Sequence, residues 1–196
     1  VYTAQFFGLV VVLEGQGFYI KKEHFDGLAK VFVDEKIELF GHDLKQLVKV
    51  LEVNKIKILN PIFDVMIASY LLSPGSRAHD PVSVVLKVLG KALPTGAGQE
   101  SLFGVDARSA AEELRLIYQT ADKLKQDLIK TDDLGLFQKV EMPLIFVLAE
   151  MELNGIAVDL KMLAKLSAEA KIAIKKLTQK IYKMSGQEFN IASPQQ

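Results

Sequence analysis

Apolar and polar positions predict an α/β chain that becomes helical in its second half. Residues 6–13 are apolar on both faces of an extended chain and rich in β-branched side chains, as expected of a central strand. The Gly-rich residues 14–17 provide a turn before a second strand over residues 18–20, which predicts a β-hairpin. A helix, a short strand and another helix follow, over about residues 24–33, 37–40 and 43–53.

From Asp64 onward the pattern is largely helical. Asp64 and Asp80 each fit the N-cap position of a helix, and Pro81 fits the first helical turn. The Gly- and Pro-containing residues 91–99 predict a surface loop, after which a further helix begins near Asp106.

Two helices are predicted at the C-terminal end. The first covers residues 136–153, after a boundary at residues 131–133, and Pro143 either kinks it or marks its true start. Asp159 caps the second, which carries an apolar seam and ends at Gly186. Because the connecting loop is short, an antiparallel pairing of the two helices is more economical than the alternative, a coiled coil between two copies of the chain. The seam consists of residues 163, 166, 170, 174, 177, 181 and 184.

Composition limits the chemistry that this chain can perform. Its 196 residues are 49% hydrophobic and 24% charged, the balance of a globular domain with a core. Disulfides, thiolate nucleophiles and clustered-His metal sites are excluded, because there is no Cys and the three His are scattered. A metal site would therefore need carboxylates. The longest apolar runs are far shorter than the roughly 20 residues of a membrane span. No leader precedes the first strand, and we expect the chain to be a piece of a longer protein.

Charge is unevenly distributed, although the net charge is zero. From Ile156 onward there are seven Lys and three acidic residues, a balance of +4, so the rest of the chain carries −4. A basic end beside an acidic body suits an element that faces phosphate groups. Because a Lys-rich stripe is also typical of the solvated face of any helix, charge alone leaves both interpretations open.

Three segments resemble one protein family. Residues 63–72 (FDVMIASYLL), followed by His79-Asp80, resemble the F-D-x-M-x-x-S-Y-x-L … H-D stretch in the exonuclease domain of polymerase-I-type (family A) DNA polymerases. Residues 141–144 (EMPL) and 151–159 (MELNGIAVD) look like the E-x-P-L … M-E-x-x-G-x-x-V-D run that opens the polymerase thumb. Residues 186–194 (GQEFNIASP) resemble the G-x-E-F-N-x-x-S-P segment that ends the long helix of the thumb. The order and spacing match over nearly the whole chain.

The resemblance implies a ribonuclease-H-like (DEDD exonuclease-type) mixed sheet with flanking helices over residues 1–132, and the N-terminal part of a helical thumb over residues 133–196. It implies a monomeric, cytoplasmic bacterial polymerase that acts in DNA replication and repair. The implied partners are a primer–template DNA duplex and the palm and fingers, which lie outside these residues; no membrane is involved. The whole polymerase would need Mg²⁺, and no cofactor is expected in this part.

The family's nuclease holds two divalent metals with carboxylates from three motifs, and two of these are missing here. Residues 1–5 hold no acid that could supply the Asp-x-Glu of the first strand. Residues 43–47 read DLKQL, which places Leu47 where the family has a metal-binding Asp. Asp43 lies one turn earlier, about 6 Å along the helix axis, and is better explained as a helix cap.

The third motif keeps Tyr118 and Asp122, four residues apart on one helix face. The family uses the Tyr to orient water and the Asp to hold metal, but one carboxylate and one phenol do not hold two dications. The resemblance therefore implies a nuclease-like domain that has no intact catalytic or metal site and serves as a scaffold. Two alternatives remain open: an active 3′–5′ exonuclease whose first motif lies upstream of Val1, and a helical adaptor that dimerises through the apolar seam.

In the thumb, the resemblance assigns DNA contacts to Asn190 and Ser193, which match the Asn and Ser of F-N-x-x-S. Their side chains would donate to phosphate oxygens without reading the base sequence. Lys176, Lys180 and Lys183 near the end of the helix either add positive charge to this contact or serve as plain solubilising residues.

Overall fold

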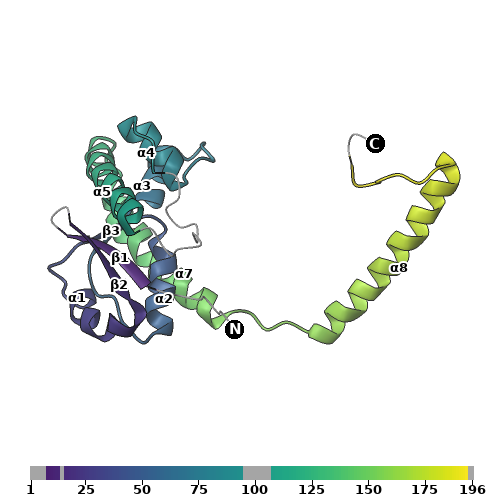
Figure 1. The fold of residues 1–196 in the computed structure, drawn as a ribbon, viewed down its shortest axis with the longest axis horizontal. Coiled ribbons are helices and arrows are strands. Elements are labelled where there is room, and N and C mark those ends of the chain that lie inside the picture. The colour runs from purple at the N-terminus through teal and green to yellow at the C-terminus, as the bar shows by residue number, and fades with distance from the viewer. Residues whose placement is uncertain (1–7, 14–15, 95–106, 194–196) are drawn as a thin grey trace. The chain divides into compact units, whose positions relative to one another are not determined.

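The structure, a computed structural model, describes residues 8–13, 16–94 and 107–193 (Figure 1). The chain forms two compact units, Val1–Gly155 and Ile156–Gln196. The first contains the described strands and most of the helices, and the second contains one long helix and the segment after it. The predicted boundary after residue 132 lies inside the first unit. Because a family domain and a compact unit are different properties of a chain, that boundary stays a prediction.

An antiparallel hairpin opens the first unit. Strand β1 (Gly8–Leu13) pairs with β2 (Gln16–Lys21), from Gly8 opposite Lys21 to Leu13 opposite Gln16. The predicted hairpin is confirmed, but its turn is shorter than predicted because Gln16 and Gly17 pair within the sheet. Among the described strands, β1 is also not central: it belongs to a two-stranded sheet. Helix α5 (Ala107–Lys130) packs against both strands, which accounts for the apolar side chains of β1.

A β-α-β unit follows the hairpin. The 3₁₀ helix η1 (Lys22–Leu28) and the short helix α1 (Ala29–Phe32) replace the single helix predicted there. Strand β3 (Leu39–Gly41) leads into α2 (Leu44–Val53), and β4 (Ile62–Asp64) then lies parallel to β3. The three-residue strand β4 was not predicted. Its apolar residues run directly into those of α3, so the hydrophobic pattern alone does not distinguish the strand from the helix. Strand directions are mixed, as predicted, but the described strands form two separate pairs.

Helices enclose the core of this unit. Helix α3 (Val65–Leu72) and helix α4 (Pro81–Leu89) both pack against α5. The Asp80 carboxylate accepts a hydrogen bond from the Ser83 amide at 3.0 Å, and Pro81 lies in the first turn of α4, as predicted. The aromatic ring of Phe63 lies at the centre of the core, 5.7 Å from that of Phe40 and 4.7 Å from that of Phe137. None of the helices in the described ranges is both long enough and apolar enough to cross a lipid bilayer. The loop predicted at residues 91–99 and the helix start near Asp106 lie partly outside the described residues.

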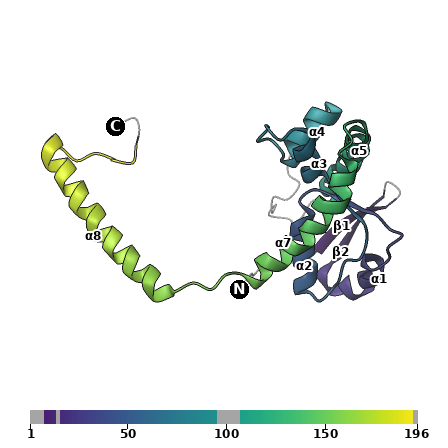
Figure 2. The same cartoon turned by 180° about the vertical axis from the view of Figure 1, so that it is seen from behind.

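Pro143 lies inside one uninterrupted helical segment, residues 134–154, directly after a π-helical turn. The segment predicted as a single helix consists of α6 (Leu134–Leu136), the π-helical η2 (Phe137–Glu141) and α7 (Met142–Asn154). Pro143 lies in the first turn of α7, and the regular α-helical hydrogen bonding is interrupted by the π-helical turn just before it. Helix α7 packs against α2, and the two lie side by side in both ribbon views (Figure 2).

The second unit consists of α8 (Leu160–Ser185) and the segment that follows it. The Asp159 carboxylate accepts hydrogen bonds from the amides of Lys161 and Met162 at 2.9 and 3.0 Å, which confirms the predicted cap. Gly186 ends the helix, as predicted, with φ of 72°. Within this unit the described residues form no second helix to cover the apolar seam. The pairing of the seam with residues 136–153 stays a prediction.

Candidate functional site

The Asp64 carboxylate joins the starts of two helices. It stands at the end of β4, directly opposite Gly41 at the end of β3, and only 1% of its surface is exposed. One of its oxygens, Oδ2, accepts from the Leu44 amide at 2.7 Å, and the other, Oδ1, accepts from Met66 at 2.9 Å and Ile67 at 3.4 Å. Oδ1 also accepts from the Asp43 amide at 3.2 Å. Asp64 therefore caps α3, as predicted, and in addition caps α2, which sequence reasoning missed.

Asp43 does not cap α2 through its side chain, so the prediction for this residue was wrong. It occupies the N-cap position in a left-handed conformation, with φ of 52°, and makes no capping hydrogen bond. Its Oδ1 is buried and has no hydrogen-bond partner among the described residues. Parallel pairing of β3 and β4 instead brings Asp64 to the amides of Asp43 and Leu44 at the start of α2. Burial raises the pKa of Asp64 above its usual value, although the hydrogen bonds from Leu44 and Met66 oppose this shift.

The remainder of the first family motif also has a structural role. Ser69 Oγ and His79 Nδ1 are 3.0 Å apart, and the Tyr70 ring lies edge-on to the His79 ring with centroids 5.7 Å apart. These contacts tie α3 to the segment that leads into α4. The motif positions the helices around the core, and none of these contacts builds a reactive group.

Leu47 is packed as an apolar residue. It lies on α2, partly buried against the hydrophobic core. Helix α2 packs chiefly against α7, whereas α5, which carries Tyr118 and Asp122, packs against the strands, α3 and α4. Leu47 does not line the hollow in which Tyr118 and Asp122 lie. Tyr118 and Asp122 thus line one hollow, and Leu47 is not among its lining residues.

Tyr118 and Asp122 share an open hollow with two lysines. The Tyr118 side chain is 55% exposed, and its ring meets the Phe40 ring edge-on at 5.0 Å. Asp122 Oδ2 accepts a hydrogen bond from Gln126 Nε2 at 3.3 Å, one turn further along α5. The residues that line the hollow are Leu89, Lys91, Tyr118, Gln119, Asp122 and Lys123.

These residues do not fit a pair of divalent metals. A dication of this type needs several carboxylate oxygens that converge on one point. In the part of the chain that the structure describes, no three His, Asp or Glu side chains gather in a way that could hold a metal ion. Lys91 and Lys123 beside Asp122 add positive charge where a metal centre needs negative charge. The position of the first-strand motif falls in residues 1–7, outside the described residues.

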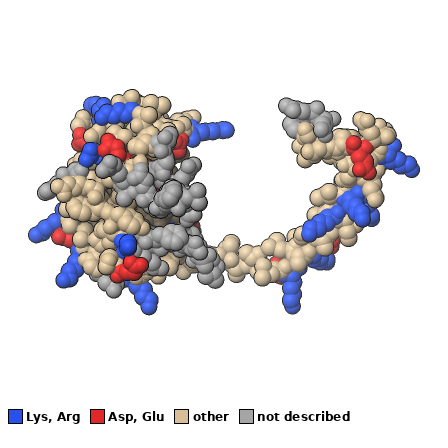
Figure 3. All heavy atoms as spheres, in the orientation of Figure 1, with Lys and Arg blue, Asp and Glu red and all other residues tan. Residues whose placement is uncertain are grey.

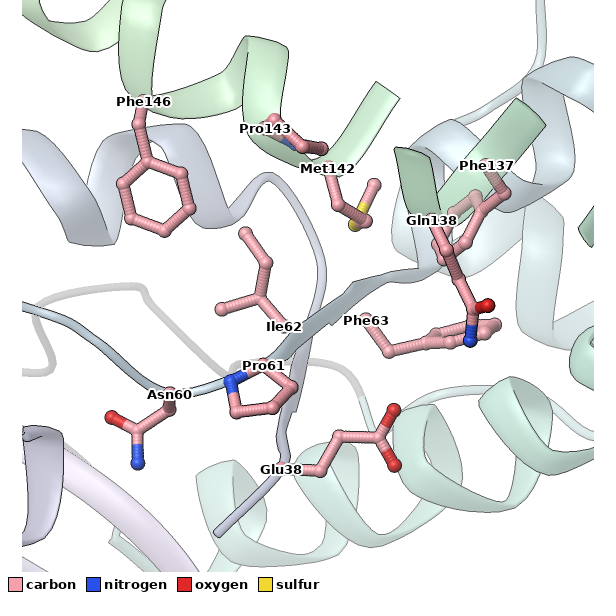
Figure 4. A pocket seen from close by; sticks show the side chains of 10 residues that line it. All are labelled: Glu38, Asn60, Pro61, Ile62, Phe63, Phe137, Gln138, Met142, Pro143 and Phe146. Atoms are coloured by element: carbon pink, nitrogen blue, oxygen red, sulfur yellow. The ribbon is translucent and has the colours of Figure 1, made fainter. Parts of the chain in front are cut away.

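A second hollow, of about 370 Å³, lies where α7 meets β4 (Figure 4). Met142 and Pro143 of the EMPL motif, together with Phe146, face Ile62 and Phe63 across it. At its edge, the Glu38 carboxylate forms an ion pair with Lys125 Nζ at 3.1 Å. None of the predicted site residues lines this hollow. Helix α7, which carries Met142 and Pro143, thus packs against β4.

An ion-pair cluster ties α7 to α2. The Glu152 carboxylate, from the MELNG motif, accepts from Lys45 Nζ at 2.5 Å and from Lys49 Nζ at 2.6 Å. The side chain of Lys49 is only 6% exposed. The two Lys hydrogen bonds hold the pKa of Glu152 below its usual value. Sequence reasoning identified Glu152 as a motif residue but did not anticipate its partners, which lie more than 100 residues earlier.

In the second unit, Asn190 and Ser193 lie on one turn. The Ser193 amide donates to the Asn190 carbonyl oxygen at 2.9 Å, and the Ala192 amide donates to Asn190 Oδ1 at 3.1 Å. The structure thus brings the two predicted phosphate contacts together just after the end of α8. The three predicted lysines Lys176, Lys180 and Lys183 lie in the last three turns of α8, and lysines are conspicuous along this helix in Figure 3.

Comparison with known proteins identifies the family. Residues 1–111, more than half of the chain, match the family model of the ribonuclease H-like domain of DNA polymerase I. The chain belongs to the DNA polymerase I family. This confirms both the recognised family and the ribonuclease-H-like fold class.

Several DNA polymerase I proteins are similar to this chain. That of Bacillus subtilis is 33% identical over 165 residues, which cover 79% of the chain and 18% of the relative. That of Streptococcus pneumoniae R6 is 31% identical over 87% of the chain, and that of Bacillus caldotenax is 30% identical over the whole chain. The chain spans 18–24% of the length of these three relatives.

A solved structure supports the same assignment. It is the POL domain of Pol1 from M. smegmatis, in complex with DNA primer-template and dNTP. The two chains are 28% identical, with a TM-score of 0.70, and the match covers 93% of this chain and 31% of the other. The match extends beyond residue 111 and so includes part of the helices after the ribonuclease H-like domain.

Proposed function

We propose that this chain is the nuclease-like and thumb-entry part of a bacterial DNA polymerase that acts in cytoplasmic replication and repair. Its nuclease-like domain does not hydrolyse DNA and instead serves as a scaffold for the thumb. One observation carries this proposal: at the positions where the family places metal-binding carboxylates, the chain has a core-packed Leu47 and an Asp122 flanked by lysines. Replacing a ligand carboxylate by Leu lets apolar packing take the place of a hydrated ion.

The contacts of α7 support the scaffold role. This helix lies against β4 at the second hollow and is tied to α2 by Glu152, so the start of the thumb is attached to the nuclease-like fold at two separate points. The ion pair of Glu152 with the buried ammonium of Lys49 favours a single arrangement of the two helices, because breaking a buried ion pair is costly. This attachment gives the domain a structural role that does not depend on hydrolytic activity.

Degradation of single-stranded DNA tests the loss of nuclease activity. The full polymerase would be incubated with 3′-labelled single strands and Mg²⁺ or Mn²⁺, in parallel with Asp122→Ala and the matched control Asp127→Ala. Asp127 lies on the same helix, where it pairs with Lys130. We expect the wild type and both variants to release no label above background. Metal-dependent release that Asp122→Ala abolishes and Asp127→Ala preserves would show an active exonuclease instead.

We further propose that the second unit grips duplex DNA through its phosphates. Support comes from the turn that carries Asn190 and Ser193, from the three lysines before it, and from the related Pol1, whose structure is a complex with primer-template. Such contacts hold the duplex without reading its sequence. The charge balance of +4 from Ile156 onward suits a polyanionic partner.

The salt dependence of binding tests the lysines. Each Lys that neutralises a phosphate adds about 0.9 to the slope of log affinity against log salt concentration. In the full polymerase, Lys180→Ala and Lys183→Ala should each weaken primer–template binding and reduce this slope by about one. Lys165→Ala, near the other end of α8, is the control and should leave the slope nearly unchanged. If the slope is unchanged in all three variants, Lys180 and Lys183 do not contact phosphate.

A further inference from the structure

Tyr182 holds the segment after α8 against the last turns of that helix. Its hydroxyl donates to the carbonyl oxygen of Phe189 at 2.8 Å, and the two aromatic rings meet edge-on with centroids 5.8 Å apart. Gly186 makes this return possible, because its left-handed conformation turns the chain back at the end of the helix. We call these contacts between Tyr182 and Phe189 the Tyr182 clasp.

The clasp lies directly before the turn that carries the proposed phosphate contacts. Asn190 follows Phe189 in the chain, and its carbonyl and side-chain oxygens close the turn onto Ser193 and Ala192. A second hydrogen bond crosses the chain reversal at Gly186, where Ser185 Oγ donates to the Gln187 carbonyl oxygen at 2.7 Å. The residue before the turn, Phe189, is thus bonded to the helix, and the turn is closed by its own hydrogen bonds.

We infer that Tyr182 is a positioning residue for phosphate binding, which holds Asn190 and Ser193 in the arrangement that meets the DNA backbone. This inference rests on the proposed grip of duplex DNA by the second unit. Fixing the backbone of a residue in one conformation costs conformational entropy. A segment that is already fixed in the free protein does not incur this cost when DNA binds, so preorganisation raises affinity without a new DNA contact.

Removing only the Tyr182 hydroxyl tests the inference. Tyr182→Phe keeps the ring contact with Phe189 and removes the hydrogen bond, and Tyr182→Ala removes both. Tyr70→Phe is the matched control, because Tyr70 lies on α3 in the other unit and is half exposed. Binding of a primer–template duplex to the full polymerase would be followed by fluorescence anisotropy. From the usual value of one hydrogen bond, we expect Tyr182→Phe to weaken binding about threefold to tenfold. Tyr182→Ala should weaken binding more, and Tyr70→Phe should leave it unchanged.

A double-mutant cycle separates positioning from a general structural role. If Tyr182 acts through the turn, Tyr182→Phe has no further effect once Asn190→Ala and Ser193→Ala are in place. The salt slope should also stay unchanged in Tyr182→Phe, because no charge is removed. A full Tyr182→Phe effect in the Asn190→Ala, Ser193→Ala background would overturn the positioning role.

The remaining outcomes distinguish this inference from the proposal beneath it. If Asn190→Ala and Ser193→Ala weaken binding but Tyr182→Phe does not, the phosphate contacts stand and the positioning role is wrong. If Asn190→Ala and Ser193→Ala leave the affinity unchanged, the proposed contacts fail, and the inference about Tyr182 fails with them. Circular dichroism of each variant checks that α8 keeps its helical content.

Discussion

The two units of this chain are held together in different ways. Unit Val1–Gly155 has a continuous apolar core, and its buried Lys49, Asn60 and Asp64 bond to distant parts of the sequence. Unit Ile156–Gln196 is built from local contacts: a capped helix, a glycine stop and a clasp between residues seven positions apart. Its apolar seam has no covering helix among the described residues of that unit. The first unit therefore specifies its own tertiary structure, whereas the second specifies a helix and a turn and needs a partner to bury the seam.

The largest expected effect tests whether the aromatic core stabilises the first unit independently of the second. Phe63 is 1% exposed and lies between Phe40 and Phe137, so Phe63→Ala should cost about 3–5 kcal/mol of unfolding free energy. Phe189→Ala makes the same chemical change at a half-buried site in the second unit and should leave the main transition in place. Urea denaturation of the 196-residue chain, followed by circular dichroism, measures both. Equal losses in the two variants would mean that the units unfold as one.

The next largest effect tests the shared helix cap. Asp64→Ala removes the acceptor of four backbone amides at the starts of α2 and α3, and we expect a loss of about 2–3 kcal/mol, two caps together. Asp80→Ala, which removes one exposed cap, should cost about 1 kcal/mol. The same denaturation experiment measures both. A loss in Asp64→Ala no greater than in Asp80→Ala would show that Asp64 caps only one helix.

The smallest effect concerns the pH dependence of the ion pairs that join α2 and α7. Because Lys45 and Lys49 lower the pKa of Glu152 below 4.5, these ion pairs stabilise the fold above pH 4.5 and are lost as the pH falls through the lowered value. Glu152→Gln should therefore lower the denaturation midpoint at neutral pH and flatten its decline below pH 4.5. Burial gives Asp64 the opposite sign, since its raised pKa favours the folded state at low pH, but this contribution is common to both proteins.

Glu150→Gln is the matched control for this measurement. Glu150 is exposed and lies two residues earlier on the same helix. Its replacement should leave the denaturation midpoint unchanged between pH 3 and pH 7. If Glu150→Gln and Glu152→Gln behave alike, the bonds to Lys45 and Lys49 do not contribute to stability.

Local patterns in the sequence determined much of this protein. The hairpin, α2, α8, the caps by Asp64, Asp80 and Asp159, and the stop at Gly186 depend on residues close together in the chain, and all were predicted. The family followed from three motifs, since residue types and their spacing along the chain are read without knowledge of the fold. The candidate positions Leu47, Tyr118, Asp122, Asn190 and Ser193 came from those motifs, and their roles in binding or catalysis stay predictions.

Only the tertiary structure decided which distant groups meet. It brought Asp64 to the first amide of α2, that of Leu44, because β3 and β4 pair in parallel. It paired Glu152 with Lys45 and Lys49, and it placed Lys91 in the same hollow as Asp122. Caps, turns and helix ends are stabilised within a few residues of sequence, whereas the partner of a buried carboxylate is chosen by packing among segments that approach only in the folded chain.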